Sequence, residues 1–583
     1  MKSKAATKSN SLSWNDWIAH NDASFHNFSP QEARDIREAL LTWYRQHRRK
    51  LPWRGDPSPW DGSTVDFAQR SAKQTMTGNR PVVKQRKMNH FFGKKKETSH
   101  SAVAAADQPL DPVVVFPFTA YGVWVSEIML QQTRVEAVIP YWAKWMTTFP
   151  TVQDLAAASD EQVNAHWAGL GFYRRARLLH QAAKVVTNEM DGQLPTTVEG
   201  LLKLDGIGRY TASAIASIAY NITVPVVDGN VCRVLSRLRA IAQNVKDKAL
   251  KDEWGWTLAT QIVEAGDGSC AGEVNQALME LGATYCAPSG TGVEDGDPLK
   301  EFYWSTQLGR EFVNAYCKKT KLLPVAFSGH DDDSDATTNR CPICAADGIQ
   351  QVMDALMDSV DADGTKNLKT DGSIGHSVFP LPPPKTFKIE QVYAVAVLTR
   401  RVHDTGETAV LMVRRPSKGL LAGQWEFPSA LLWSSDNAAC SKKREKRKDM
   451  SNHIPEFTKI ARKRALDSFL KDLTRSKCLA NLPDVKRINM GESPLEHVFS
   501  HVRHTLWIEH GSVSAADDVN EGTKSLESVD AIQDREVRWM LESDMENVGV
   551  TSCVRKILKS VKQKVTNNTK QASSGSQKRK KER

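Results

Sequence analysis

The sequence lacks any run of about eighteen or more apolar residues, which excludes a membrane-spanning helix. Its first residues, Met1 to Lys4, have no apolar stretch, so we expect no secretory signal. Cysteines are few, nine in 583 residues, and in a chain without such a signal they favour free thiols or metal ligands over disulfides. No large excess of one charge is present, since 78 Lys and Arg face 68 Asp and Glu. This modest basic surplus fits a polyanionic partner without requiring one.

A glycine pair begins a short helix in the middle of the chain. Gly206-Ile207-Gly208-Arg209 lies between an apolar run and the small residues 211–219, which predicts a tight turn at a helix N-terminus. Outward N–H groups there bind phosphate, although most such pairs are ordinary turns. Asp228 strengthens the interpretation, because it follows an apolar strand-like run and precedes Gly229-Asn230. A phosphate-binding hairpin beside a half-buried acid suggests chemistry on DNA.

Two further segments carry candidate functional side chains. Residues 121–133 predict a helix that is apolar around most of its circumference and contains one carboxylate, Glu127. Burial would raise the pKa of Glu127 toward neutrality, as a general acid requires; the alternative is a glutamate at the helix edge that reaches solvent. Residues 167–177 alternate small, aromatic and basic side chains, which suits backbone approach and ring insertion into DNA. Packing beneath a solvated face is the alternative for that segment.

Together these segments resemble the helix-hairpin-helix DNA glycosylases, and most closely the MutY-type adenine DNA glycosylases. The pattern from Ser126 to Thr133 matches that family, as do Gly206 to Arg209 and Val227 to Val231. The resemblance implies a mainly α glycosylase core with an iron–sulfur loop, an α+β Nudix-like C-terminal domain and long disordered insertions. The endonuclease III-like branch has a lysine where this chain has Tyr210, which cannot form a Schiff base. A monofunctional glycosylase is therefore implied, acting on adenine opposite 8-oxoguanine or guanine and leaving an abasic site.

The resemblance also assigns roles to individual residues. Glu127 would protonate the adenine, Asp228 would stabilise the sugar cation, and Tyr210 would position or screen that acid. The expected DNA contacts are Gln132, Phe172, Tyr173, Gly206, Gly208, Arg209 and Asn230. The expected adenine pocket consists of Trp53, Arg54 and Gln276. Phe172 replaces a family tyrosine, so stacking should survive while a hydroxyl hydrogen bond is lost.

Four cysteines follow the presumed core: Cys286, Cys317, Cys341 and Cys344. Residues 275–286 resemble the family segment that leads into its iron–sulfur loop, which implies a [4Fe–4S] cluster with these four ligands. The family spaces its ligands closely, whereas here a long acidic insertion follows Cys286 and no cysteine follows Cys344 at the expected place. A zinc site or a degenerate loop are alternatives, because a CxxC pair with two more cysteines also suits zinc.

A polar and basic insertion, residues 62–116, interrupts the pattern and is expected to be a disordered loop. It contains a match to the motif that binds the sliding clamp PCNA, formed by Gln85, Met88, Phe91 and Phe92. One helical turn would place the three apolar side chains together as a plug for a hydrophobic pocket. A basic linker that touches DNA is the alternative.

A second globular pattern begins near residue 391 with two predicted strands. Residues 419–428 resemble the Nudix-like domain of MutY-type proteins, but no box of paired glutamates for Mg²⁺ follows. We therefore expect this domain to read DNA rather than hydrolyse nucleotides. By the resemblance, 8-oxoguanine is read by Phe499, Ser500 and His501, where an ordinary strand containing a serine is the alternative.

The predicted organisation combines two folded domains with tails and linkers. It comprises a disordered N-terminus (1–33), a glycosylase core (34–345) with an acidic insertion (287–340), a linker (346–386), a Nudix-like domain (387–560) and a basic tail (561–583). Basic runs near residues 442–448 and 578–581 fit nuclear import signals or solvated tails. We expect a monomer in the nucleus, and a mitochondrial copy stays open. The rival functions are an endonuclease III-like glycosylase/lyase and a catalytically silent DNA-binding or clamp scaffold.

Overall fold

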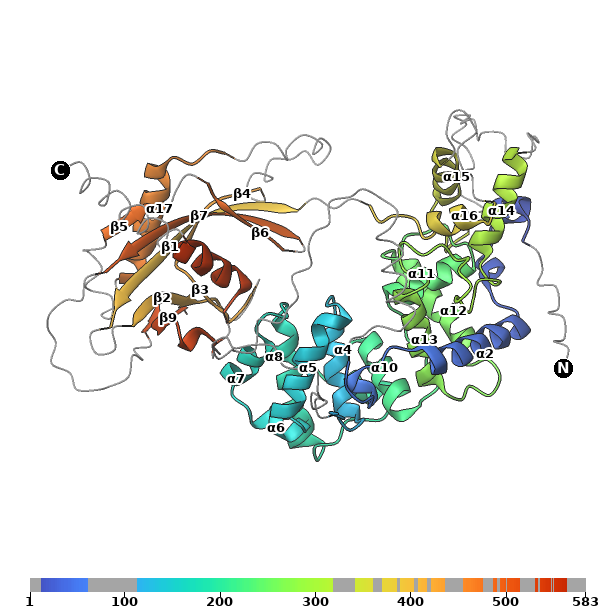
Figure 1. Cartoon of the computed structure of the whole chain (residues 1–583), viewed down its shortest axis with the longest axis horizontal. Helices are drawn as coiled ribbons and strands as arrows, with labels where there is room; N and C mark the ends of the chain where they lie inside the picture. The colour runs from blue at the N-terminus through green and yellow to red at the C-terminus, as the bar shows by residue number, and fades with distance from the viewer. Residues whose placement is uncertain are drawn as a thin grey trace, which may run out of the picture. The chain divides into compact units, whose positions relative to one another are not determined.

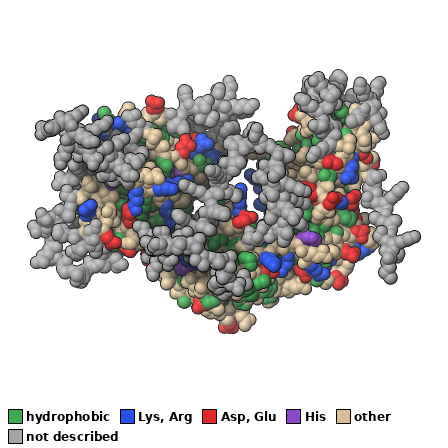
Figure 2. Space-filling view, in the orientation of Figure 1, with side chains coloured by type: hydrophobic (Ala, Val, Ile, Leu, Met, Phe, Trp, Pro, Cys, Tyr) green, Lys and Arg blue, Asp and Glu red, His purple; other side chains and the backbone are tan. Residues whose placement is uncertain are grey.

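The computed structural model describes residues 12–60, 113–317, 341–359, 370–384, 388–402, 407–416, 421–435, 455–474, 486–489, 493–499, 501–513, 530–532, 535–546, 548 and 550–563. They form two compact units (Figure 1). Unit 1 contains the residues up to Met146 together with 195–203 and 207–383, and unit 2 contains 147–194, 204–206 and the residues from 384 onward. None of the helices among these residues has the length and apolar character needed to cross a membrane. In the view of Figure 2, basic and acidic side chains are interspersed on both units.

Unit 1 is helical. Its elements are α1 (Trp14–Ala19), η1 (Ala23–His26), α2 (Pro30–His47), η2 (Pro52–Arg54), α4 (Ala120–Leu130), α5 (Val135–Thr148), α9 (Val198–Leu201), α10 (Arg209–Tyr220), α11 (Gly229–Leu238), the π-helical η3 (Ala249–Trp254), α12 (Gly255–Val263), α13 (Ala271–Ala283), α14 (Trp304–Cys317), α15 (Gly348–Asp358) and α16 (Ser373–Val378). Helix α4 begins at Thr119, whose hydroxyl accepts from the Gly122 N–H. Because α4 is apolar on all sides, it is buried along nearly its whole length and carries Glu127 into the interior.

Unit 1 extends beyond the predicted boundaries of the core. The predicted disorder of residues 1–33 is wrong for 12–33, because Trp17 of α1 is buried in the core. The acidic insertion is folded from 287 to 317, where Phe312 of α14 packs in that same apolar cluster. The predicted linker contains α15 and α16, and Leu356 also joins the cluster. These helices were not predicted because their apolar residues are widely spaced in otherwise polar segments. Residues 318–340 and 360–369 lie outside the described residues.

The basic insertion also ends earlier than predicted. Residues 113–116 lie against unit 1, where the Val114 N–H donates to Ser58 Oγ at 2.8 Å. The ring of Phe116 meets Trp142 edge to face at 5.3 Å. The rest of the insertion, from 62 to 112, lies outside the described residues.

Unit 2 contains a group of three helices and a mixed sheet. Each face of the sheet is covered by a further helix. Its elements are α6 (Val152–Ala157), α7 (Asp160–Trp167), α8 (Arg174–Glu189), β1 (Ile389–Arg401), β2 (Thr408–Arg414), β3 (Trp425–Glu426), β4 (Ser429–Ser434), α17 (Lys459–Thr474), β5 (Lys486–Asn489), β6 (Leu495–Val498), β7 (Val502–Ser512), β8 (Asp530–Ile532), β9 (Arg535–Leu541), η8 (Asp544–Glu546) and a helix at 552–563. The strand order is β5-β7-β1-β2-β9-β8, and β1 pairs with β7 in parallel while the other pairs are antiparallel.

The alternation of side chains along β1 explains the two covered faces of the sheet. Val395 and Val397 belong to the cluster that includes the 552–563 helix, whereas Ala396 and Leu398 belong to the cluster that includes α17. A strand buried on both faces reads as one apolar run, as Val392 to Leu398 does. The predicted α+β domain is therefore confirmed.

Candidate active site and metal centre

Glu127 lies in the middle of α4 with 6% of its surface exposed. Burial raises the pKa of this carboxyl to about 7, against the opposing effect of the hydrogen bond from Tyr210. The Tyr210 hydroxyl donates to Glu127 Oε2 at 2.8 Å. A sizeable fraction of Glu127 side chains therefore holds a proton at neutral pH. This is the protonation state that a general acid requires.

Asp228 is the N-cap of α11 and lines the same cavity as Glu127, a space of about 600 Å³ in unit 1. Its Oδ1 accepts from the N–H groups of Asn230 and Val231, each at 2.8 Å. Its Oδ2 accepts from Asn230 Nδ2, also at 2.8 Å. Burial raises the pKa of Asp228, and these hydrogen bonds oppose the shift. Donors at a helix N-terminus hold the carboxylate in one orientation toward the cavity.

Arg233 anchors the Asp228 segment to the end of α13, a role that sequence reasoning missed. Its Nη2 donates to Asn230 Oδ1 at 2.7 Å and to the Gly282 carbonyl at 2.6 Å. Its Nε donates to the Cys286 carbonyl at 2.8 Å. The acid at Asp228 is thereby fixed to two helices, and no short-range signal in the sequence marks that connection.

The predicted adenine-pocket residues Trp53, Arg54 and Gln276 all line this cavity. Arg54 Nε donates to Gln276 Oε1 at 3.0 Å, and its Nη2 donates to Glu280 Oε2 at 3.1 Å. Arg49 adds a second ion pair with Glu280 at 2.7 Å. Burial by itself would raise the pKa of Glu280, but the two arginines lower it to about 2.

Glu280 therefore stays ionised and holds Arg54 against Gln276. Arg49 and Glu280 were both missed from the sequence. A weaker signal was available for Glu280, which lies among apolar residues in the second half of the helix 271–283, whereas Glu273 of the same helix lies in its first turn.

The predicted DNA contacts at Gln132, Gly206, Gly208 and Arg209 lie at exposed positions. Gln132 follows α4 with a φ of 58°, and its exposed side chain lines the cavity. Gly206 has a φ of 83°, a conformation that favours glycine, whereas Gly208 has a φ of −93° and caps α10 without a side chain. Arg209 stacks on Trp256 at 3.8 Å from the ring centroid. Asn230 is committed to Asp228 and Arg233, so its predicted contact with DNA stays a prediction.

The aromatic pair of unit 2 divides into one exposed and one buried ring. Phe172 is 44% exposed at a φ of 51°, and Arg175 lies against its ring at 5.4 Å. This placement agrees with the predicted insertion into DNA without testing it. Tyr173 was expected to contact DNA as well, but it is buried and its hydroxyl donates to the Val550 carbonyl at 3.3 Å. The apolar ring of Tyr173 thus packs inside unit 2, and the prediction of direct contact was wrong.

The predicted cysteine ligands are not brought together. Cys341 and Cys344 form a four-residue group with His20 and His26, whose ligand atoms all lie within 4.8 Å of one another. It is the one group of three or more such ligands among the described residues, and it does not include Cys286. Cys317 ends α14, and its side chain lies outside the description. Of the four predicted cysteine ligands, two therefore lie with a pair of histidines and Cys286 lies apart from them.

The two imidazoles are oriented for metal binding by backbone carbonyls. His26 Nδ1 lies 2.9 Å from the Arg239 carbonyl, and His20 Nδ1 contacts the Trp17 carbonyl. Since a carbonyl can only accept, each Nδ1 carries the proton and each Nε2 presents a lone pair. Both Nε2 atoms lie 3.6 Å from Cys344 Sγ. Two nitrogen and two thiol ligands with carbonyl-bound imidazoles match a closed zinc site.

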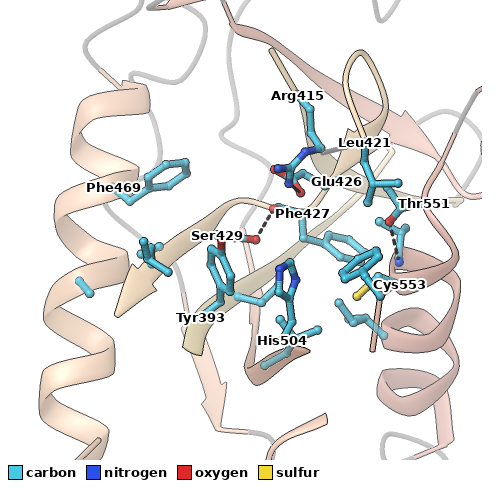
Figure 3. Close-up of a pocket in the computed structure, with 18 of the residues that line it drawn as sticks. Tyr393, Arg415, Leu421, Glu426, Phe427, Ser429, Phe469, His504, Thr551 and Cys553 are labelled. Atoms are coloured by element: carbon cyan, nitrogen blue, oxygen red, sulfur yellow. Dashed lines mark hydrogen bonds and ion pairs between the residues drawn. The ribbon is translucent and has the colours of Figure 1, made fainter. Parts of the chain in front are cut away.

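A second cavity, of about 570 Å³, lies within the Nudix-like part of unit 2 (Figure 3). Tyr393 and His504 from neighbouring strands point into it, beside the ion pair of Arg415 with Glu426. Phe499 also lines it, and its ring packs against His504 at 4.8 Å. His501 is exposed in the turn between β6 and β7. Ser500 lies outside the described residues, as do the clamp-motif residues Gln85, Met88, Phe91 and Phe92.

Comparison with known proteins identifies the family of this chain. Residues 125–257 match the HhH-GPD superfamily of base excision DNA repair proteins, and residues 400–560 match the NUDIX domain. The adenine DNA glycosylase of Mus musculus is 32% identical over 488 residues, covering 83% of this chain and 72% of the mouse protein. That of Homo sapiens is 31% identical over 541 residues, covering 92% of this chain and 76% of the human protein. The chain belongs to the adenine DNA glycosylase family.

A solved thermostable thymine-DNA glycosylase is 21% identical, with a TM-score of 0.31, and the match covers 46% of this chain and 92% of that one. Proteins with the HhH-GPD fold commonly bind a [4Fe–4S] cluster. In this adenine DNA glycosylase family member the donor set does not fit that cluster, because Cys341 and Cys344 face two imidazoles and Cys286 lies outside their group.

Proposed function

We propose that this glycosylase hydrolyses the N-glycosidic bond of adenine opposite 8-oxoguanine or guanine in duplex DNA and leaves an abasic site. One observation carries the proposal. A single cavity of unit 1 contains a buried glutamate with a pKa of about 7, a tyrosine bonded to it and an aspartate fixed at a helix N-terminus. These are the groups needed to protonate a leaving base and to stabilise a sugar cation.

The reaction begins when the adenine leaves the base stack and enters the cavity beside Trp53 and Gln276. Glu127 donates its proton to the base and weakens the bond to the sugar. Positive charge then develops on the sugar, where ionised Asp228 stabilises it electrostatically or by a transient bond. The adenine departs in its neutral form, and a water molecule adds to the sugar and gives a proton back to the Glu127 carboxylate.

Tyr210 favours simple hydrolysis over strand cleavage by elimination. A lyase needs an amine that attacks the sugar, whereas the pKa of Tyr210 is raised well above its usual value, mainly by burial and then by Glu127. The phenol therefore stays neutral and acts by donating to Glu127 Oε2. This supports a monofunctional glycosylase over the endonuclease III-like alternative. The intact trio of Glu127, Tyr210 and Asp228 argues against a silent scaffold.

The preference for 8-oxoguanine rests on the turn between β6 and β7. The Phe499 N–H donates to the Val502 carbonyl at 2.8 Å, and Lys388 Nζ donates to the Phe499 carbonyl at 3.1 Å. These contacts fix the backbone on either side of position 500. A serine there can donate and accept toward the altered edge of the purine. We propose that Ser500 and His501, between β6 and β7, read the lesion.

The metal of this protein, in our proposal, is one zinc ion held by His20, His26, Cys341 and Cys344. Zinc would supply structure and no chemistry, because four protein ligands leave it no open position. It would join the N-terminal segment before α2 to the segment before α15, which are more than three hundred residues apart in the sequence.

Single-turnover excision tests the proposed reaction. Duplexes with adenine opposite 8-oxoguanine are incubated with the protein, and alkali then reveals abasic sites. We expect Glu127→Gln and Asp228→Asn each to lower the rate at least about 100-fold while lesion binding persists. Glu136→Gln, an exposed glutamate on the adjacent helix α5, is the matched control and should leave the rate unchanged. Near-normal excision by either active-site variant, or strand cleavage without alkali, would refute the assignment.

A further inference from the structure

Cys286 ends the segment that leads into the iron–sulfur loop in related glycosylases, yet here its thiol is enclosed by other side chains. It is fully buried just after α13. Arg237 Nη1 lies 3.3 Å from its Sγ, and His376 Nε2 lies 3.9 Å from it. The Tyr303 hydroxyl contacts the same thiol. Protein groups from α11, α16 and the chain before α14 thus surround the sulfur atom.

Arg237 also binds the backbone of the turn that follows Cys286. Its Nη1 donates to the carbonyls of Cys286 and Ala287, each at 2.9 Å. Its Nε donates to the Phe379 carbonyl at 2.8 Å, directly after α16. One buried guanidinium therefore ties the turn to two helices. If a cluster were bound here through several cysteines, the turn would have to be tied to these helices at other positions.

The chain after Cys286 fills the remaining space. Leu299 and Tyr303 are fully buried in the main core cluster of unit 1. A Cβ at Gly292 would lie 2.3 Å from His376 Nδ1, and a Cβ at Gly296 would lie 2.1 Å from the Tyr285 hydroxyl. The chain that follows Cys286 thus packs directly against His376 and Tyr285, with no space for a side chain at either glycine.

Too few cysteines remain for a cluster. A [4Fe–4S] cluster takes four cysteine thiolates. Between Cys286 and the start of the second domain the sequence offers Cys317, Cys341 and Cys344, and the last two face His20 and His26.

We propose that this glycosylase assembles no iron–sulfur cluster, and that the Arg237 network around Cys286 takes over the cluster's structural role. The enzyme would then be an iron-free member of its family, and the connection from the Cys286 turn through Arg233 to Asn230 would be made of protein alone.

Metal analysis of the full chain tests this proposal. The protein is expressed in iron-replete cells and purified without oxygen, so that a labile cluster is not lost to air. Iron, acid-labile sulfide and visible absorbance are measured on the same sample as zinc. We expect no iron, no sulfide and no visible charge-transfer band. Substoichiometric iron without sulfide would also support the proposal, since only a cluster carries both; iron and sulfide in equal amounts, near four of each per chain, would overturn it.

Cys286→Ser distinguishes a packed thiol from a cluster ligand. We expect this variant to keep its thermal midpoint within a few degrees and its excision rate within about twofold, because serine retains the contact with Arg237. Loss of visible absorbance together with loss of folding would instead identify Cys286 as a ligand. The zinc measurement on the same sample keeps this outcome separate from failure of the proposed zinc site, and excision kinetics keep it separate from failure of the proposed reaction.

Discussion

In the proposed reaction, Glu127 can act as an acid only because α4 places it away from water. The same side chain on an exposed helix would be ionised at neutral pH and could not give a proton to a base. Tyr210 moderates this effect, since its hydrogen bond stabilises the charged form and lowers the pKa that burial raises. The balance between burial and one hydrogen bond sets the working pH range of the enzyme.

Removal of the Tyr210 hydroxyl should shift the pH profile upward. Excision requires protonated Glu127, so the wild-type rate should fall as the pH rises through about 7. Tyr210→Phe removes a donor that lowers the pKa, and the basic limb should therefore move to higher pH. The measurement is the single-turnover rate between about pH 5 and 9. Movement of the limb to lower pH, or no movement, would contradict this account of Tyr210, and Glu136→Gln should reproduce the wild-type curve.

The sequence predicted the catalytic residues better than the residues that support them. Glu127 and Asp228 stand out because each is a lone acid in an apolar run, and Tyr210 because it replaces a lysine of related enzymes. Arg233 and His20 carry no such local signal, since their partners lie far along the chain. Tyr173 shows the opposite error, in which a pattern that suits DNA contact equally suits a buried ring.

At the scale of elements, the two glycines of the hairpin before α10 have different roles. Gly206 needs its positive φ, and a Cβ there would lie 2.7 Å from the Cβ of Leu178. Gly208 has an ordinary φ, and an added Cβ would meet nothing within 4 Å. The first glycine is thus required by the fold, and the second leaves room for an approaching phosphate.

A pair of alanine substitutions should separate these tasks. Gly206→Ala should lower the thermal midpoint by several degrees, because it strains the backbone and collides with Leu178. Gly208→Ala should leave the midpoint nearly unchanged and weaken binding to duplex DNA several-fold, because its methyl group would face the phosphate. Thermal unfolding and DNA titration at fixed salt measure both effects. Equal loss of stability in the two variants would contradict the distinction.

Zinc removal should destabilise the two segments of unit 1 that the ion would join. Cys344→Ser, or a strong chelator, should abolish zinc binding and lower the thermal midpoint by several degrees, because the N-terminal segment loses its attachment. Cys270→Ser is the control, since Cys270 lies outside the group and faces Arg45. The measurements are zinc content and thermal unfolding. Unchanged zinc in Cys344→Ser would exclude this ligand set.

At the scale of the whole chain, sequence patterns predicted both domains but not the edges of the first. The apolar runs of β1 and of α4 are local signals and were read correctly. Helices α1, α14, α15 and α16 are short or polar, and they are stable only because they pack on one another and on α11. Stability that comes from tertiary packing cannot be read from the residue pattern of a short sequence segment.

The clamp motif is an independent prediction, and it falls outside the described residues. We propose that Met88, Phe91 and Phe92 insert into a hydrophobic pocket of the sliding clamp. Phe91→Ala/Phe92→Ala should reduce recovery of the glycosylase on immobilised clamp at least about tenfold, while excision on short duplexes stays unchanged. Lys94→Ala is the control, because it removes one positive charge and retains both rings. Equal recovery of the wild type and the double variant would favour a DNA-touching linker instead.

The guanidinium of Arg237 beside Cys286 has a consequence for cells. An oxidant burst creates the lesions that such an enzyme answers, and it also attacks exposed inorganic sulfide. A repair protein whose interior is stabilised by arginine hydrogen bonds in place of a cluster would stay active under that oxidation. It would also need neither a sulfur donor nor an assembly scaffold to mature. Nutritional scarcity of iron would then not limit its supply.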